Sequence, residues 1–330
     1  MPQVSMPVEY DVVGVGNALV DVIAHADEAF IDHHDLVKGS MTLVDTDRAL
    51  HLYRALGTAV QMSGGSAANT LTGVASFGGR AAYIGKVGDD DLGQVFGHDM
   101  RAVGVHFRAG QSEGGIPTGR CIIVVTPDAQ RTMNTYLGVS SLLHAGDIDE
   151  RTVAAGALLY MEGYLYDRPE AKEAFRVAAS VAHAHGRQVS LTLSDSFCVD
   201  RHRADFRALV ADEVDLLFGN EAELTSLYEV DTLEQAVACV RGDCALTVIT
   251  VGAQGSLVVT PDEVIAVPAQ PVERVLDTTG AGDLFAAGFL YGYTRGNDLH
   301  RCATLGGMAA AEVISHVGPR PLVELKSLLA

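Results

Sequence analysis

The sequence predicts an α/β fold in which a doubly wound, mostly parallel sheet lies between two layers of helices. Apolar segments of strand length alternate along the chain with amphipathic segments of helix length, as a parallel sheet covered on both faces requires. No repeat or low-complexity linker interrupts this order. With 330 residues, of which 48% are hydrophobic, the chain can bury a large core. We therefore expect residues 1–330 to form a single domain.

The predicted strands are short apolar runs, and the helices between them carry an apolar face. In chain order, we expect a strand at 10–16, a helix after Gly65, a strand at 81–85, a helix at 90–103, strands at 158–163, 188–193, 214–218 and 246–251, and helices at 169–184 and 201–210. Two stretches, 18–46 and 106–137, break the alternation. They predict short strands joined by turns, because turn residues such as Gly114 and Gly115 interrupt them.

Composition excludes several classes of protein. The net charge of −19, from 23 basic and 42 acidic residues, argues against a nucleic-acid-binding surface. No apolar run reaches 18 residues, and residues 1–9 lack a basic segment leading into an apolar one, so we expect neither a membrane span nor a secretory signal. The five cysteines have no C-x-x-C spacing, and the histidines show no metal-ligand spacing. These features favour a cytoplasmic protein without structural zinc or disulfides.

Residues 277–290 carry the clearest chemical signal in the chain. Gly280, Ala281 and Gly282 have little or no side chain, so a phosphate can approach their backbone N–H groups at the start of a helix. Asp283 falls in the first turn of that helix, where it can orient and deprotonate an attacking hydroxyl. The segment predicts a phosphoryl-transfer centre with Asp283 as the base. For so short a motif, a glycine turn with Asp283 as a helix cap is the alternative.

Two other glycine-rich segments do not fit the nucleotide-binding motifs that they partly match. Residues 14–19 begin like a dinucleotide-binding fingerprint, but Leu19 occupies the third glycine position, where close packing leaves no room for a side chain. Residues 79–86 are one residue too long for a P-loop, and Val87 replaces the Ser or Thr that binds magnesium. The sequence therefore argues against both a Rossmann dehydrogenase and a P-loop kinase.

The chain resembles the ribokinase (PfkB) family of carbohydrate and nucleoside kinases through four motifs in the family's order. These are S-G-G-S-A-A-N-T at 63–70, N-E-A-E at 220–223, T-V-G-A-Q-G at 250–255 and D-T-T-G-A-G-D at 277–283. The resemblance implies a three-layer, ribokinase-like fold and ATP-dependent phosphorylation of a hydroxyl group. It also implies that stretches 18–46 and 106–137 form a small β lid over the acceptor, and that the lid sheet joins two copies in a homodimer.

The same resemblance assigns site residues by their place in the motifs. Residues Gly64, Gly65, Ser66 and Asn69 are assigned to the acceptor, and residues Asn220, Glu223, Thr250, Gly252 and Gly255 to ATP. Glu223 is expected to help bind Mg²⁺, largely through water. A potassium ion is expected to be held by carbonyls near Asp277 and Thr279 and near 313–318. In so acidic a protein, candidate cations that offset the charge of the nucleotide are Lys86, Arg120 and Arg131, and Arg131 is also assigned to the acceptor.

Within the family, segments 16–21, 117–121, 191–197 and 217–221 resemble those of adenosine kinases. Asp21 is then the ribose anchor, because a carboxylate can accept hydrogen bonds from two vicinal hydroxyls at once. Asn17 and Asn69 complete this polar end. The adenine end needs flat apolar surfaces, and its candidates are Leu19, Phe107, Tyr136, Tyr164, Tyr166 and Phe197, of which Tyr164 and Phe197 match the family's apolar wall.

Two other functions are left open. Glu162 and Asp195 are more polar than their counterparts in eukaryotic adenosine kinases and could bind extra hydroxyls, so ribose, fructose or 2-keto-3-deoxygluconate is an alternative acceptor. Both carboxylates could equally be caps or surface charges. A nucleotide-binding protein without kinase activity is a third hypothesis, and the intact segment from Gly280 to Asp283 argues against it.

Overall fold

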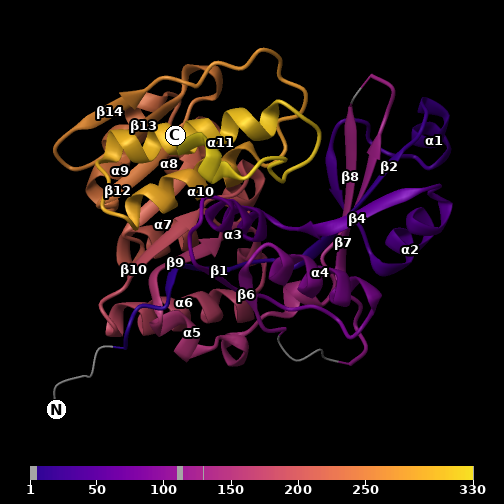
Figure 1. Ribbon diagram of the computed structural model, residues 1–330, viewed down its shortest axis with the longest axis horizontal. Helices are drawn as coiled ribbons and strands as arrows, with labels where there is room; N and C mark the ends of the chain where they lie inside the picture. Colours follow the sequence, from indigo (N-terminus) through magenta and orange to yellow (C-terminus); the bar gives the residue numbers. More distant parts are fainter. Residues whose placement is uncertain (1–5, 110–113, 129, 330) are drawn as a thin grey trace.

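The computed structural model describes residues 6–109, 114–128 and 130–329, and these residues form one nine-stranded and one five-stranded sheet (Figure 1). Parts of the sequence predictions lie outside the described residues, namely 1–5 and 330 of the predicted single domain and 110–113 and 129 of the second predicted lid stretch. The larger sheet and its helices occupy one side of the view in Figure 1, and the smaller sheet stands at the other side.

The larger sheet is parallel except at one edge, where its last two strands run antiparallel to their neighbours. In sheet order, its strands are β14 (Val264–Val267), β13 (Ser256–Val259), β12 (Leu246–Thr250), β11 (Leu216–Asn220), β10 (Gln188–Thr192), β9 (Gly156–Glu162), β1 (Tyr10–Val15), β5 (Ala81–Ile84) and β6 (Val105–Phe107). Successive residues of one strand enter opposite cores: Val12 packs with one hydrophobic cluster and Val13 with the other. The predicted doubly wound sheet follows from this two-sided burial.

Helices cover both faces of the larger sheet. One core contains residues of α3 (Ser66–Ser76), α4 (Asp91–Ala102), α10 (Ala281–Tyr293) and α11 (Leu299–Ile314). The other contains residues of α5 (Glu150–Ala154), α6 (Pro169–Ala184), α7 (Ser196–Glu213), α8 (Glu221–Tyr228) and α9 (Leu233–Asp243). Short 3₁₀ helices are η1 (Gly138–Leu142), η2 (Ala145–Asp147), η3 (Gly163–Asp167), η4 (Gly252–Gln254) and η5 (Leu325–Leu329).

The smaller sheet contains strands from both predicted lid stretches. In sheet order they are β3 (Met41–Leu43), β8 (Arg131–Tyr136), β7 (Gly119–Val125), β2 (Leu19–His25) and β4 (Ala59–Gly64). Two helices accompany it, α1 (Glu28–His33), which Asp27 caps, and α2 (Thr46–Ala55), which contacts β7 and β8. The structure adds β4, which pairs antiparallel with β2 although it lies outside both predicted stretches. It assigns β6 to the larger sheet, as the parallel neighbour of β5.

The order of the parallel strands reverses beside β1, and this reversal determines where a ligand can bind. From β1 the chain continues to β5 and β6 on one side of the sheet and to β9, β10, β11 and β12 on the other. Ligands of such sheets bind at a reversal of this kind, beyond the carboxyl ends of the strands. Within the described residues, no helix is long and apolar enough to cross a membrane.

Candidate active site

A cavity of about 770 Å³ lies between the carboxyl ends of the larger sheet and the smaller sheet. Three groups of residues line it. From the smaller sheet and its connections come Leu19, Asp21, Met41, Leu43, Cys121, Ile123, Met133, Thr135 and Leu137. From the ends of β9 to β12 come residues including Glu162, Tyr164, Thr192, Ser194, Asp195, Asn220, Glu223 and Thr250. The N-termini of α3 and α10 contribute Gly65, Ser66, Asn69 and residues 278–283.

The start of α10 has the shape that the glycine-rich motif predicts. Gly280 is its N-cap with φ of +79°, a left-handed conformation that favours glycine, and no side chain caps the helix. A Cβ at Gly280 would lie 2.8 Å from Cα of Pro319, so the position also lacks room for a side chain. A Cβ at Gly282 would have open space around it. Backbone N–H groups at this helix N-terminus are therefore accessible to an anion from the cavity.

Asp283 is held by two side chains of α3. Ser66 donates from Oγ to Asp283 Oδ1 at 2.6 Å, and Asn69 donates from Nδ2 to Asp283 Oδ2 at 2.9 Å. Burial raises the pKa of Asp283, while these hydrogen bonds and the charge of Arg320 oppose the rise. The carboxylate therefore has a fixed orientation at the cavity wall and a raised affinity for a proton, which are the properties of a general base.

The turn before α3 needs glycine for steric reasons. Gly65 has φ of +98°, and a Cβ there would lie 2.2 Å from the carbonyl oxygen of Asn17. Four residues on, Asn69 is 5% exposed, and its Oδ1 is buried without a hydrogen-bond partner. Because a buried acceptor without a partner is costly, this oxygen is available to a hydroxyl or amine of a ligand in the cavity.

Asp21 lies on β2 with 7% of its surface exposed, and it lines the same cavity. A Cβ at Gly64 would lie 2.5 Å from the Asp21 carboxyl group, so the glycine of the neighbouring strand leaves space for this side chain. Burial raises the pKa of Asp21 to about 6, against the charges of Arg320 and Arg131. Asp21 forms no side-chain hydrogen bond with another described residue, so its carboxylate can accept from a ligand's hydroxyls.

Glu162, at the end of β9, links the segment between β1 and β2 to the first turn of α3. Its Oε1 accepts from Asn17 Nδ2 at 3.0 Å, and its Oε2 accepts from the backbone N–H of Ala67 at 2.8 Å. Burial raises the pKa of Glu162 to about 7, although these hydrogen bonds oppose the shift. Asn17 does not line the cavity and acts on it through Glu162. These hydrogen bonds fix the position of the Glu162 carboxyl group at the polar end of the cavity.

At the opposite end, Asn220 and Glu223 form a capping box at the start of α8. Glu223 Oε2 accepts from the backbone N–H of Asn220 at 3.0 Å, and its Oε1 accepts from Asn220 Nδ2 at 2.7 Å. Burial raises the pKa of Glu223 to about 7, and the charges of Asp195 and Asp283 add to the rise. Both residues line the cavity, as does Thr250. Gly252 and Gly255 form the positive-φ turn that follows β12, outside the cavity lining.

Three of the six predicted adenine-wall residues line the cavity: Leu19, Tyr164 and Phe197. Phe197 is 72% exposed, so a flat ligand can cover its ring. Phe107 and Tyr166 are buried in the two helix-covered cores. Tyr136 lines a separate, smaller cavity of about 290 Å³. Tyr136 is the last residue of β8, and the face of the sheet on which its side chain lies depends on the register of that strand. The sequence does not determine this register.

The predicted cations lie outside the cavity lining. Lys86 is fully buried, with its Nζ 2.9 Å from Asp147 Oδ2. Arg120 lies over the ring of Tyr53, with 5.8 Å between the guanidinium carbon and the ring centroid. Arg131 reaches from β8 to Asp277 beside the α10 N-terminus, with 2.9 Å between Nη2 and Oδ2. This last ion pair joins the smaller sheet to the glycine-rich segment.

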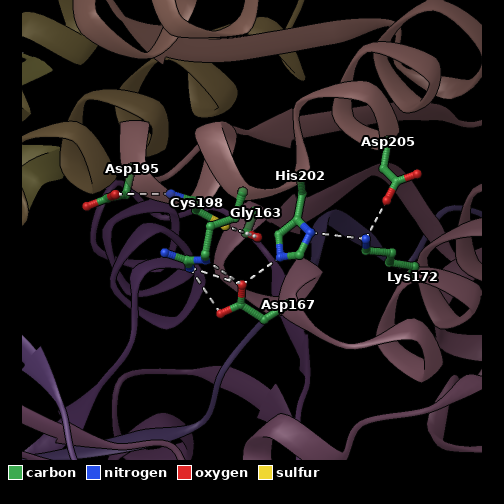
Figure 2. Close-up of polar contacts among 8 residues, drawn as sticks. Gly163, Asp167, Lys172, Asp195, Cys198, His202 and Asp205 are labelled. Carbon is green, nitrogen blue, oxygen red and sulfur yellow. Dashed lines mark hydrogen bonds and ion pairs between the residues drawn. The ribbon is translucent and has the colours of Figure 1, made fainter.

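A polar network links η3, which contains Tyr164, to α7, which contains Phe197. Figure 2 shows the contacts of this network. Asp195 caps α7 by accepting from the N–H of Cys198, whose thiol lies 3.4 Å from the Gly163 carbonyl oxygen. Further along α7, Arg201 and His202 both contact Asp167 at the end of η3, at 3.0 and 2.7 Å. His202 departs from helical geometry, which bends α7 where these contacts form. The network fixes η3 against α7 and thereby the spacing of the two aromatic residues.

Sequence reasoning missed several residues of the site. Met41, Leu43, Ile123 and Met133 line the cavity from the smaller sheet, and Arg320 approaches its acidic groups from the C-terminal loop. Ser194 has φ of +71°, and the N–H of Asp195 donates to the Leu193 carbonyl across it, a strained turn at the cavity wall. Alternation in β3 and β8 is a signal that could have identified the apolar residues. Arg320 belongs to none of the four motifs.

Comparisons with known proteins agree with this geometry. The model of the pfkB family carbohydrate kinases matches residues 40–325. A crystal structure of adenosine kinase from Sinorhizobium meliloti has 50% identity and a TM-score of 0.90, covering 98% of this chain and 99% of that one. A probable sugar kinase protein from Rhizobium etli has 46% identity and a TM-score of 0.90, covering 97% and 98%. Adenosine kinase 1 of Arabidopsis thaliana is 27% identical, covering 92% of this chain and 94% of that protein. The predicted fold is confirmed.

Proposed function

Since the chain belongs to the pfkB family of carbohydrate kinases, we propose that it transfers the γ-phosphate of ATP to the 5′ hydroxyl of adenosine, producing AMP. One observation carries this proposal: a carboxylate suited to act as a base, a helix N-terminus suited to phosphate and a second buried carboxylate line one cavity with apolar side walls. The 50% identity with an adenosine kinase supports adenosine as the acceptor.

For the transfer itself, we assign the base to Asp283 and the stabilisation of phosphate charge to the backbone N–H groups after Gly280. Ser66 and Asn69 orient the base, so a hydroxyl that meets Asp283 loses its proton to a fixed oxygen. Phosphoryl transfer has a loose transition state, so the base need not remove that proton in advance. Positioning and the helix N-terminus then contribute most of the rate enhancement.

We assign nucleotide and metal binding to the end of the cavity that contains Asn220, Glu223 and Thr250. The like charges of Asp195 and Asp283 disfavour the ionised form of Glu223, and a divalent cation bound through its waters would relieve that repulsion. When bound, Mg²⁺ supplies positive charge that neutralises the phosphates.

For the acceptor, we assign the ribose to Asp21 and Asn69 and the adenine to the walls at Leu19, Tyr164 and Phe197. Asp21 is buried and can accept from both hydroxyls of a cis-diol, while Asn69 offers its unpaired Oδ1. The apolar residues of the smaller sheet complete a surface that a planar purine can cover and a free sugar would leave largely empty.

A sugar acceptor is the second candidate, because the 46% identical protein from Rhizobium etli is described as a probable sugar kinase. Glu162 lines the cavity and is the group that could bind extra hydroxyls. Both of its oxygens already accept hydrogen bonds from Asn17 and Ala67, which favours a structural role. The cytoplasmic location, the potassium ion and a homodimer through the lid stay predictions.

An acceptor panel tests this function. We expect ATP consumption with magnesium and potassium to be fastest with adenosine, slower with inosine and 2′-deoxyadenosine, and slowest with ribose, fructose and 2-keto-3-deoxygluconate. Loss of one hydroxyl partner of the ribose-binding carboxylate costs roughly 1–3 kcal/mol of binding free energy. The kcat/KM of the deoxy analogue should therefore be about 5- to 150-fold lower than that of adenosine. Preference for a free sugar would keep the kinase chemistry and remove the adenine assignment. Equal rates with and without every acceptor would contradict the proposal.

A further inference from the structure

Arg320 is an arginine of the C-terminal loop that contacts the backbone on both sides of the Gly64–Gly65 turn. Its Nη2 donates to the carbonyl oxygen of Ser63 at 2.8 Å and to Ser63 Oγ at 3.1 Å. Its Nη1 donates to the carbonyl oxygen of Ala68 at 3.3 Å. The guanidinium therefore joins the end of β4, which adjoins Asp21 on β2, to the first turn of α3, which supplies Ser66 and Asn69.

The charge of Arg320 acts on both carboxylates of the proposed site. It lowers the pKa of Asp21 and the pKa of Asp283, in each case against the effect of burial. The charge of Arg131 also lowers the pKa of Asp21, whereas Arg320, alone among the cations of the described residues, lowers the pKa of both carboxyl groups. Burial lowers the pKa of Arg320 itself to about 10, so it is still charged at neutral pH. The other groups near it are Asp99 and the hydroxyl of Tyr83.

We propose that Arg320 is a positioning residue of the phosphoryl-transfer reaction: its N–H groups fix the backbone turn between Ser63 and Ala68, and the positive charge held at that turn acts on both Asp21 and Asp283. This inference rests on the proposed function, because it assigns Asp283 as the base and Asp21 as the acceptor anchor. We assign Arg320 no contact with the acceptor's hydroxyl or with the phosphate, so it acts through Asp21 and Asp283.

The surroundings of Asp283 explain why the charge matters. Its hydrogen-bond partners Ser66 and Asn69 are neutral. Apart from Arg320, the ionisable groups of the described residues that interact electrostatically with it from other elements are acids: Asp21, Glu162, Glu223, Tyr160 and Tyr164. In a chain of net charge −19, the three carboxyl groups raise the proton affinity of Asp283 when they are ionised, whereas the two tyrosines, whose pKa values are raised, stay neutral. Without Arg320, Asp283 would hold its proton up to a higher pH, and a protonated carboxyl group cannot accept the proton of the acceptor's hydroxyl.

Charge and hydrogen bonding can be separated by substitution. Arg320→Gln removes the charge and ends about where arginine Nε lies, short of the Nη atoms that reach Ser63 and Ala68, whereas Arg320→Lys keeps the charge and loses the forked geometry. A matched control is Arg187→Gln, because Arg187 also donates to backbone carbonyls, those of Ala154 and Met6, away from the cavity. Thermal unfolding of all three variants shows which of them are folded before their activity is compared.

The pH dependence of kcat tests the proposal. We expect Arg320→Gln to move the acid limb to higher pH by about one unit, the scale of losing one nearby opposite charge, and Arg320→Lys to restore most of it. Arg187→Gln should leave the limb where it is. An unmoved limb in Arg320→Gln, or no difference between the Gln and Lys variants, would overturn the role of the charge.

A second measurement needs no turnover. In protein labelled with ¹³C at the aspartate carboxyl carbons, with Asp21→Asn and Asp283→Asn used for assignment, both signals should titrate at higher pH in Arg320→Gln than in the unchanged protein. Unshifted titrations would overturn the proposal even if no acceptor of the panel were phosphorylated. Failure of the panel with shifted titrations would instead contradict the proposed function alone. If Arg320→Gln does not fold, the Lys variant still has to titrate like the unchanged protein.

Discussion

Replacing Asp283 with asparagine should lower kcat by roughly two to four orders of magnitude, the usual contribution of a general base, while ATP affinity stays nearly unchanged. Asparagine keeps the volume of the side chain and can still accept from Ser66, whose Oγ lies 2.6 Å from Asp283 Oδ1. It has no basic oxygen for the proton of the acceptor's hydroxyl. Steady-state kinetics with ATP binding measured separately distinguish the two effects.

Asp298→Asn is the matched control for this variant. Asp298 also lies at a helix N-terminus, where it caps α11 by accepting from the N–H of Arg301 at 2.7 Å, and it is exposed outside the cavity. Asparagine caps a helix about as well as aspartate, so this change should leave kcat unchanged. Near-normal turnover in Asp283→Asn would show that the base is another group.

Replacing Asp21 with alanine should raise the KM for adenosine by roughly 10- to 100-fold, because each hydrogen bond to a charged group contributes about 1.5–3 kcal/mol. The change should affect kcat less, since Asp21 is assigned to binding and not to the proton transfer. Burial raises the pKa of Asp21 to about 6, so its ionised form is unfavourable in the folded protein. The free energy of unfolding of Asp21→Ala near neutral pH should therefore be at least as large as that of the unchanged protein.

The deoxy analogue provides the control for Asp21. In the unchanged protein, 2′-deoxyadenosine should bind less well than adenosine, because one lone pair of Asp21 loses its partner. In Asp21→Ala the two nucleosides should bind with equal affinity. The difference in binding free energy that disappears is the interaction free energy between the Asp21 carboxylate and the 2′ hydroxyl. A preference for adenosine that survives in the variant would assign the diol to another residue.

Much of the fold could be predicted because its signals are local. The helix predicted at 169–184 coincides with α6, whose first residue is Pro169 and whose buried alanines recur on one face. The strands β9 to β12 were predicted within about two residues, because each is a short apolar run that ends at a turn. Helix α7 is longer than the predicted 201–210, since Asp195 caps it and the helix begins at Ser196, five residues earlier than predicted.

The candidate site could be predicted only where a residue's role depends on its own backbone. Gly65 and Gly280 occupy positive-φ positions, which a glycine-rich motif signals directly. The direction of Tyr136, the ion pair of Arg131 with Asp277 and the contacts of Arg320 with β4 and α3 depend on how distant segments pack. A single sequence contains no signal for such packing, and the contacts of Arg131 and Arg320 join residues more than 100 positions apart.

Gly64, beside Asp21, combines a role that its motif predicts with a steric reason that depends on a neighbouring strand. Gly64 could be assigned to the site by its motif, but its physical reason lies on another strand, where the Asp21 carboxyl group occupies the space that a Cβ would need. The antiparallel pairing of β4 with β2 places the two residues close together, and β4 was absent from the predicted elements. The motif therefore predicts Gly64 as a site residue but does not contain the steric reason for the glycine.

Identification of the product tests phosphoryl transfer to adenosine most directly. The protein is incubated with ATP, magnesium and adenosine, and the products are separated and followed by ³¹P NMR. We expect one AMP for each ADP, with the phosphorus signal split into a triplet by the two hydrogens at the 5′ carbon. ADP with free phosphate and no AMP, or a phosphate on another hydroxyl, would contradict this expectation.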